Sequence, residues 1–131
     1  MIAVAQLDLL AQARLDDSRA LLIAQRADGA TYLCGYAVEL ALKARICRQL
    51  NWPEFPDKRG EFDRYLSFKT HDLDVLLRLS GQEARIKQVH FTDWNNVSTW
   101  KPDTRYKAIG GVTLPQATDM LESTERLLKV L

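Results

Sequence analysis

Two charged side chains within the most apolar stretch of the chain are the first candidates for chemistry. Residues 30–50 read ATYLCGYAVELALKARICRQL, and between positions 32 and 47 only Glu39, Lys43 and Arg45 carry a charge. Glu39 and Lys43 are four residues apart, so on a helix they share one face, with Glu on the favourable N-terminal side. Desolvating an ion pair is costly unless other polar groups share it. The pair therefore either closes the edge of a bundle or faces a polar pocket built with other segments.

Four residues in two other segments could complete such a pocket. Lys69 and His71 stand where a helix is expected to begin, and the positive end of a helix favours the neutral imidazole, which can donate or accept a proton. Arg105 and Tyr106 follow a proline turn, and a guanidinium presents a fork suited to phosphate or carboxylate. A capping His and a solvated Arg are the alternative interpretations. The candidate catalytic residues are His71 and Arg105, and the candidate ligand-binding residues are Glu39, Lys43, Lys69, His71, Arg105 and Tyr106.

Established catalytic and metal-binding motifs are missing from the chain. It contains no GxGxxG, no GxxxxGK[ST], no HExxH and no Ser/His/Asp order. Cys34 and Cys47 lie 13 residues apart, which along one helix is about 20 Å and far beyond the reach of a disulfide. No Cys/His spacing suits zinc. Neither a metal nor a cofactor is therefore predicted.

Length and composition are those of an ordinary globular protein. The 131 residues predict one domain, residues 1–131, with 47% hydrophobic and 27% charged residues. The net charge of +1 does not indicate any class of binding partner. Residues 58–107 carry 10 basic and 7 acidic side chains, which is a weak local excess of positive charge. The N-terminus has no basic region with a cleavage site, and no apolar run reaches membrane length. We expect a cytoplasmic protein that does not enter a membrane.

Periodicity predicts helices through most of the chain. Residues 2–27 form an amphipathic pattern that should stop at Asp28-Gly29, before a core helix over residues 30–50. Residues 51–70 lack periodicity but contain five aromatic residues, which predicts an ordered excursion with one short helix near residues 61–66.

The second half of the chain continues the helical pattern. A third helix should start at Thr70 or His71 and run to position 79, with short helices over residues 83–90 and 93–99. The last helix, over residues 113–131, opens with Thr113 and Gln116 spaced as a capping box. These elements predict an all-α, up-and-down helical bundle of four to six helices.

The order and spacing of several short motifs resemble those of HEPN domains (higher eukaryotes and prokaryotes nucleotide-binding), in their stand-alone bacterial type. The similarity runs from about residue 15 to the C-terminal helix, and its most specific parts are the long helix with Glu39 and Lys43 and the His-Asp-Leu helix start. The matching segments are Asp28-Gly29-Ala30, YLCGYAVELALKA at 32–44, KTHDL at 69–73, Trp100 and Arg105-Tyr106.

The resemblance implies an all-α bundle that is usually a homodimer and is often encoded with, or fused to, a minimal nucleotidyltransferase. Some members are ribonucleases, including toxins, and these carry an Arg followed four to six residues later by a His at the dimer interface. Here no His follows Arg105. Arg85 and His90 have four residues between them and Arg64 and His71 have six, so both pairs satisfy the spacing when the intervening residues are counted, but away from the usual place of the motif. We therefore expect that this chain is not an enzyme.

Three functions remain open from the sequence. The first is a HEPN-like dimeric module that binds a nucleotide or RNA phosphate at a polar pocket, or docks a nucleotidyltransferase. The second is a metal-independent HEPN ribonuclease of the toxin or defence type, which needs His71 close to Arg105. The third is a structural or assembly protein without a ligand. We expect Glu39, Lys43, His71 and Arg105 to converge on one site beside the core helix.

Overall fold

The computed structural model describes all 131 residues and confirms an all-α helical bundle. The only sheet pairs two short strands, β1 and β2, in antiparallel register. No helix is both long enough and apolar enough to cross a membrane. The α-helices are α1 (Val4–Ile23), α2 (Ala27–Leu50), α3 (Leu73–Leu79), α4 (Glu83–Val89), α5 (Phe91–Ser98) and α6 (Leu114–Val130).

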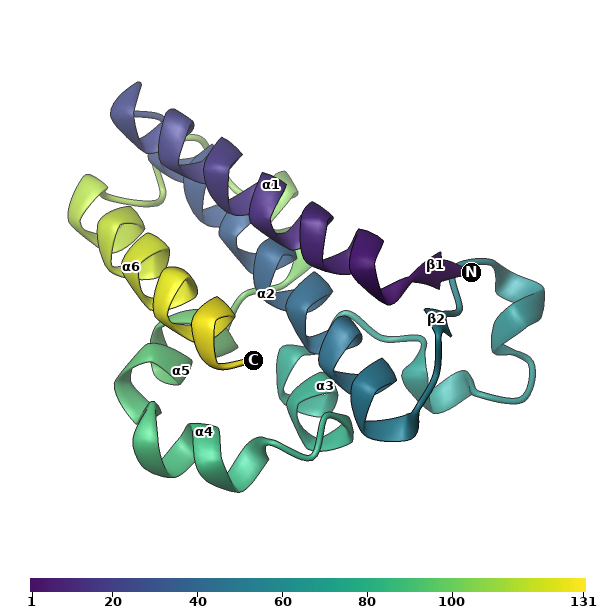
Figure 1. Ribbon diagram of the computed structural model, residues 1–131. Coiled ribbons are helices and arrows are strands. Elements are labelled where there is room, and N and C mark those ends of the chain that lie inside the picture. The colour runs from purple at the N-terminus through teal and green to yellow at the C-terminus, as the bar shows by residue number, and fades with distance from the viewer.

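Helix α2 is the centre of the bundle. It lies between α1 and α6; α1 is antiparallel to α2, and α6 is parallel to α2 (Figure 1). Helices α3 to α5 make the return path from the far end of α2 to the start of α6. Val38, Leu42 and Ile46 of α2 are fully buried, as expected for a helix that is apolar on almost every face.

The connection between α1 and α2 differs from the sequence prediction. Helix α1 ends at Ile23 rather than at residue 27, and α2 begins at Ala27 rather than at residue 30. The left-handed conformation that allows the reversal belongs to Gln25, with φ of 60°, and not to Gly29. Asp28, predicted to end the first helix, instead lies in the first turn of α2, where a carboxylate suits the positive helix end.

Residues 51–70 are ordered, as predicted, but hold two short 3-10 helices instead of one helix near residues 61–66. Strand β2 (Glu54–Phe55) pairs with β1 (Ile2–Ala3) and so ties this segment to the start of α1. The 3-10 helices η1 (Arg59–Phe62) and η2 (Leu66–Phe68) follow. Phe55 and Phe62 are buried and anchor the excursion on the core.

The two later helix starts are set by capping side chains. For α3 the cap is Asp72, and not Thr70 or His71 as predicted, because its Oδ1 accepts from the amides of Asp74 at 2.9 Å and Val75 at 3.2 Å. For α6 the predicted capping box is confirmed. The Thr113 hydroxyl accepts from the Gln116 amide at 3.2 Å, and the Gln116 carboxamide oxygen accepts from the Thr113 amide at 3.0 Å.

Candidate functional site

A buried carboxylate on α2 holds two basic side chains. Glu39 is 3% exposed, and its Oε1 accepts hydrogen bonds from Nζ of Lys43 at 2.7 Å and from Nδ1 of His71 at 2.9 Å. Lys43 comes from the next turn of α2, whereas His71 comes from the linker between η2 and α3. Three of the predicted site residues therefore meet, and they link the core helix to the start of α3.

This arrangement leaves His71 free to act on its outer side. Its side chain is 60% exposed, so the ring nitrogen that does not face Glu39 is available to solvent or to a ligand. In neutral His71, an Nδ1–H donating to the carboxylate leaves Nε2 as a hydrogen-bond and proton acceptor. Lys43 also lies 5.3 Å from the centroid of the Phe55 ring, where its ammonium contacts an aromatic face.

Two tyrosines continue this polar stripe along α2 toward its N-terminus. The Tyr32 hydroxyl donates to the Tyr36 hydroxyl at 3.4 Å, and the rings meet edge to face at 5.2 Å between centroids. The Tyr32 hydroxyl and burial raise the pKa of Tyr36 to about 12. The pKa of Tyr32 is lowered by the Tyr36 hydroxyl and, after it, by the positive charge of Arg105. Arg105 and Tyr32 also line a common groove, so Arg105 lies toward the N-terminal end of the stripe.

Arg105 is a cation without an acidic partner. It lies on η3 (Pro102–Tyr106), is exposed to solvent, and makes no ion pair with any carboxylate. Its guanidinium carbon stands 4.8 Å from the centroid of the Tyr106 ring. Contacts with the phenols of Tyr106 and Tyr32 raise its pKa, so the group is always charged. Its hydrogen-bonding fork is available to an anion.

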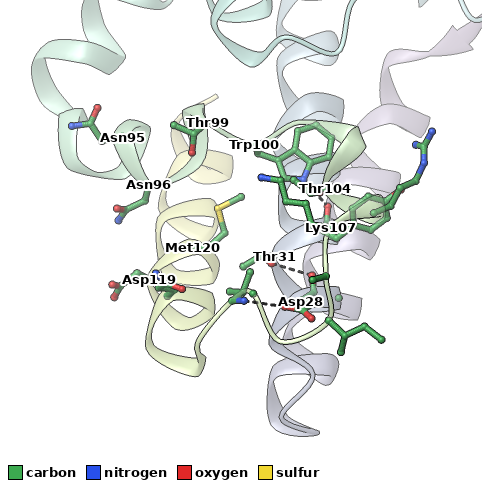
Figure 2. A pocket seen from close by; sticks show the side chains of 18 residues that line it. Asp28, Thr31, Asn95, Asn96, Thr99, Trp100, Thr104, Lys107, Asp119 and Met120 are labelled. Atoms are coloured by element: carbon green, nitrogen blue, oxygen red, sulfur yellow. Dashed lines mark hydrogen bonds between the residues drawn. The ribbon is translucent and has the colours of Figure 1, made fainter.

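The stripe adjoins a groove of about 630 Å³, lined by the N-terminal half of α2, by α5 and α6, and by residues 104–112. In Figure 2, Met120 extends from α6 toward Trp100, Thr104 and Lys107, whereas the side chains of Asn95 and Asp119 extend from α5 and α6 in the opposite direction. Arg105 and Tyr32 also line the groove. The hydroxyl oxygen of Thr104 is buried and has no hydrogen-bond partner. The groove combines apolar lining residues with several polar side chains, which is the usual character of a ligand site.

One carboxylate holds the loop that closes the end of the groove. Asp28 accepts hydrogen bonds from the amides of Gly110 at 2.7 Å and of Val112 at 3.1 Å. Gly110 has φ of 83°, a conformation that glycine adopts without steric cost. The first turn of α2 thereby fixes the segment between η3 and α6 beside the cavity.

The predicted convergence on one point is only partly observed. Glu39, Lys43 and His71 meet, but Arg105 faces Tyr32, which precedes Glu39 by seven residues, or about 10 Å along the helix. The residues instead form a stripe with a Glu39 cluster at one end and Arg105 at the other.

The remaining two predicted residues lie at the edges of this stripe. Tyr106 is 77% exposed and contacts Arg105. Lys69 is exposed and makes no ion pair or hydrogen bond with the Glu39 cluster.

Sequence reasoning did not identify the groove. Its wall is Trp100, whose indole N–H donates to the Tyr32 carbonyl at 3.1 Å and whose ring lies 4.9 Å from that of Tyr36. The available signal was Gly35 in the middle of an apolar helix, since a glycine there indicates a close approach. The pattern does not say which residue approaches, because the partner lies 65 positions away in the chain.

Comparisons with known proteins give no family for this chain. No protein-family model, no curated protein and no solved structure matches it. The residues of the stripe and the groove are therefore the evidence for a function. What these residues offer is an unpaired guanidinium, a histidine on a buried carboxylate and an adjoining cavity.

Proposed function

We propose that this protein is a HEPN-like, dimeric binding module that holds the phosphate of a nucleotide or of RNA at Arg105. The observation that carries the proposal is the exposed Arg105 guanidinium, which lines the groove and has no carboxylate partner. An arginine fork can donate two parallel hydrogen bonds to phosphate oxygens, which a point charge cannot do. The contact with the Tyr106 ring restrains the fork before a ligand arrives.

The surroundings of Arg105 favour an anion with an organic part. Lys107 lines the same groove, is exposed, and makes no ion pair, so a second cation lies within reach of the same ligand. A cavity of about 630 Å³ lies in the size range of small-molecule sites. Inorganic phosphate alone would leave most of this space unused.

The basis for proposing a dimer and a nucleotidyltransferase partner is the sequence resemblance to HEPN domains. In this form of the proposal, the same polar stripe serves as a docking surface for the catalytic protein. The partner would approach the exposed side of His71 and Arg105.

A metal-independent ribonuclease is the second candidate, and the Glu39–His71 contact is what favours it. A carboxylate that fixes one ring nitrogen leaves the other as a general base, as RNA cleavage requires. Against it, His71 is held at Glu39, whereas Arg105 lines the groove together with Tyr32, which precedes Glu39 by two helical turns, so the two candidate residues belong to different ends of the stripe. The third candidate, an assembly protein without a ligand, is what a complete failure to bind would indicate.

The test of the proposal is a binding series on Arg105 variants. Arg105→Ala should weaken binding of a fluorescein-labelled single-stranded RNA and of nucleotides by about 1.5–3 kcal/mol, the range for hydrogen bonds to charged groups. Arg105→Lys should restore little of the loss. Fluorescence anisotropy and titration calorimetry measure the Kd values. Circular dichroism checks that the variants keep the helical fold.

The matched control is Arg78→Ala, which removes the same charge from α3, far along the chain from η3 and within a local set of ion pairs. It should leave affinity within about twofold of wild type, because it changes only a screened surface charge. Equal affinities of wild type and Arg105→Ala would remove the proposal. RNA cleavage in the presence of EDTA that disappears in His71→Ala would replace it with the ribonuclease.

A further inference from the structure

The segment between α2 and α3 makes a second surface, at the opposite end of α2 from the groove. It runs from residue 51 to residue 72 and holds only the strand β2 and the 3-10 helices η1 and η2. In Figure 1 it projects beside the start of α1, beyond the last turn of α2. The groove includes Tyr32, which is about 27 Å from Leu50 along the axis of α2. A long surface segment that is packed by its own side chains is frequently functional.

Three aromatic side chains give this segment a fixed apolar surface. The Trp52 ring packs against the rings of Tyr65 and Phe68, with 5.1 Å between centroids in both pairs. Leu66 is 68% exposed and Tyr65 is 42% exposed. Because the three rings support one another, an aliphatic side chain and part of a phenol ring are held out in solvent on an ordered base.

The same segment carries positive charge that the protein does not neutralise. The four basic side chains of residues 58–69 are exposed and make no ion pair: Lys58, Arg59, Arg64 and Lys69. Of the two carboxylates in this range, Glu61 is bound by the N-terminal amine, and Asp63 is exposed without an ion pair. Arg64 and Lys69 border positions 65–68 on either side in the chain. The exposed apolar side chains are therefore flanked by unpaired cations.

We propose that this second surface docks an acidic segment of another protein, with an apolar side chain of that segment seated on Leu66. The η2 surface, as we define it, consists of Trp52, Arg64, Tyr65, Leu66 and Lys69. Charge complementarity gives the partner its class, because acidic residues on either side of the apolar anchor meet the unpaired cations and speed association. Aromatic residues and arginine are also the residues that protein interfaces favour.

Ring geometry favours a peptide over a nucleic acid on the η2 surface. A base stacks flat on an exposed ring face, whereas here the three rings meet one another at 54° to 74° between planes. The most exposed apolar group is the aliphatic side chain of Leu66, which offers contact area to an apolar side chain but no π face to a base. This inference goes beyond phosphate binding at Arg105 and does not depend on it.

The experiment selects peptides from a phage-displayed random library on the intact, immobilised chain. An excess of the double variant Arg64→Glu with Leu66→Asp is kept in solution, so that peptides that bind elsewhere on the protein are removed. The selected peptides should share Asp and Glu residues around a Phe, Trp or Leu. Failure to enrich any peptide, or a consensus without acidic residues, would overturn the inference.

The consensus peptide, labelled with fluorescein, then gives affinities by anisotropy. Leu66→Asp should weaken binding by about tenfold or more, because it removes the apolar contact and repels an acidic ligand. Arg64→Glu should weaken binding severalfold, and added salt should weaken wild-type binding. The matched controls are Val89→Asp, at an apolar side chain that is 69% exposed, and Lys129→Glu, at an exposed cation without an ion pair. Both should stay within about twofold of wild type.

The other possible occupants give different results. Equal affinities of Leu66→Asp and Val89→Asp would place the peptide elsewhere. If the double variant loses affinity for single-stranded RNA and keeps its affinity for the peptide, the surface is a nucleic-acid site. If Leu66→Asp converts a wild-type dimer into a monomer, the surface is a contact between copies of the chain. Each of these results overturns the inference. Near-ultraviolet circular dichroism checks the ring cluster, and Arg64→Glu decides the test if Leu66→Asp disturbs it.

Discussion

Gly35 determines how closely the indole of Trp100 can approach the core helix. A Cβ built on this glycine would stand 2.0 Å from atoms of the indole ring, a distance that no packed side chain tolerates. The ring so placed forms one wall of the groove and donates its N–H to the Tyr32 carbonyl. The absence of one methyl group on α2 is therefore a condition for the site.

Gly35→Ala should destabilise the fold despite the better helix propensity of alanine. Overpacking costs about 1–3 kcal/mol, whereas the Gly-to-Ala gain inside a helix is about 0.5–1 kcal/mol. Urea denaturation followed by circular dichroism measures the difference. Gly60→Ala, at a glycine with nothing within 4 Å, is the control and should change little. Equal midpoints for Gly35→Ala and wild type would show that Trp100 moves away without cost.

At the level of elements, a carboxylate joins α5 to α6. Asp93 is 8% exposed and accepts hydrogen bonds from the Ser123 hydroxyl at 3.1 Å and from Nε of Arg126 at 2.9 Å. The Arg126 guanidinium, with help from Ser123, holds the pKa of Asp93 below its usual value. The charged form of Asp93 is therefore the one that stabilises the packing of these two helices.

The stability that Asp93 contributes should depend on pH. The pKa of Asp93 is lower in the folded state than in the unfolded chain, where it is about 4. The stabilisation is therefore fully present at pH values above the unfolded-state pKa and is lost as the pH falls through the folded-state pKa. Asp93→Asn should therefore lower the free energy of unfolding at pH 7 more than at pH 3. Urea unfolding at both pH values measures this difference. A loss of the same size at pH 7 and pH 3 would contradict the assigned ion pair.

Local signals in the sequence were enough for some elements and not for others. The capping box at Thr113 and the i,i+4 pair of Glu39 and Lys43 rest on neighbours in the chain, so both were predictable. The end of α1 was missed because Gln25, a residue that rarely takes a positive φ, makes the turn next to a more obvious glycine. The groove was missed because its walls come from four separate segments.

At the level of the whole molecule, α1 carries exposed apolar side chains that could form the interface of the proposed dimer. Leu9 and Ile23 are 73% and 80% exposed on this helix. We expect wild type to sediment as a dimer of the 14.9 kDa chain at micromolar concentration, and Leu9→Lys with Ile23→Lys to sediment as a monomer. Val89→Lys on α4, another exposed apolar position, is the control and should remain a dimer. A wild-type monomer would remove the dimer from the proposal.

The central claim is that a phosphate-bearing ligand binds along the stripe and groove beside α2. The most direct measurement is a titration of ¹⁵N-labelled protein with AMP and with a short RNA, followed by two-dimensional NMR. We expect the largest shifts at the Trp100 indole N–H, the Arg105 side chain and the amides of residues 104–112, with little change in α4. Shifts that cluster on α4 or on the outer face of α1, or no shifts at millimolar ligand, would contradict the claim.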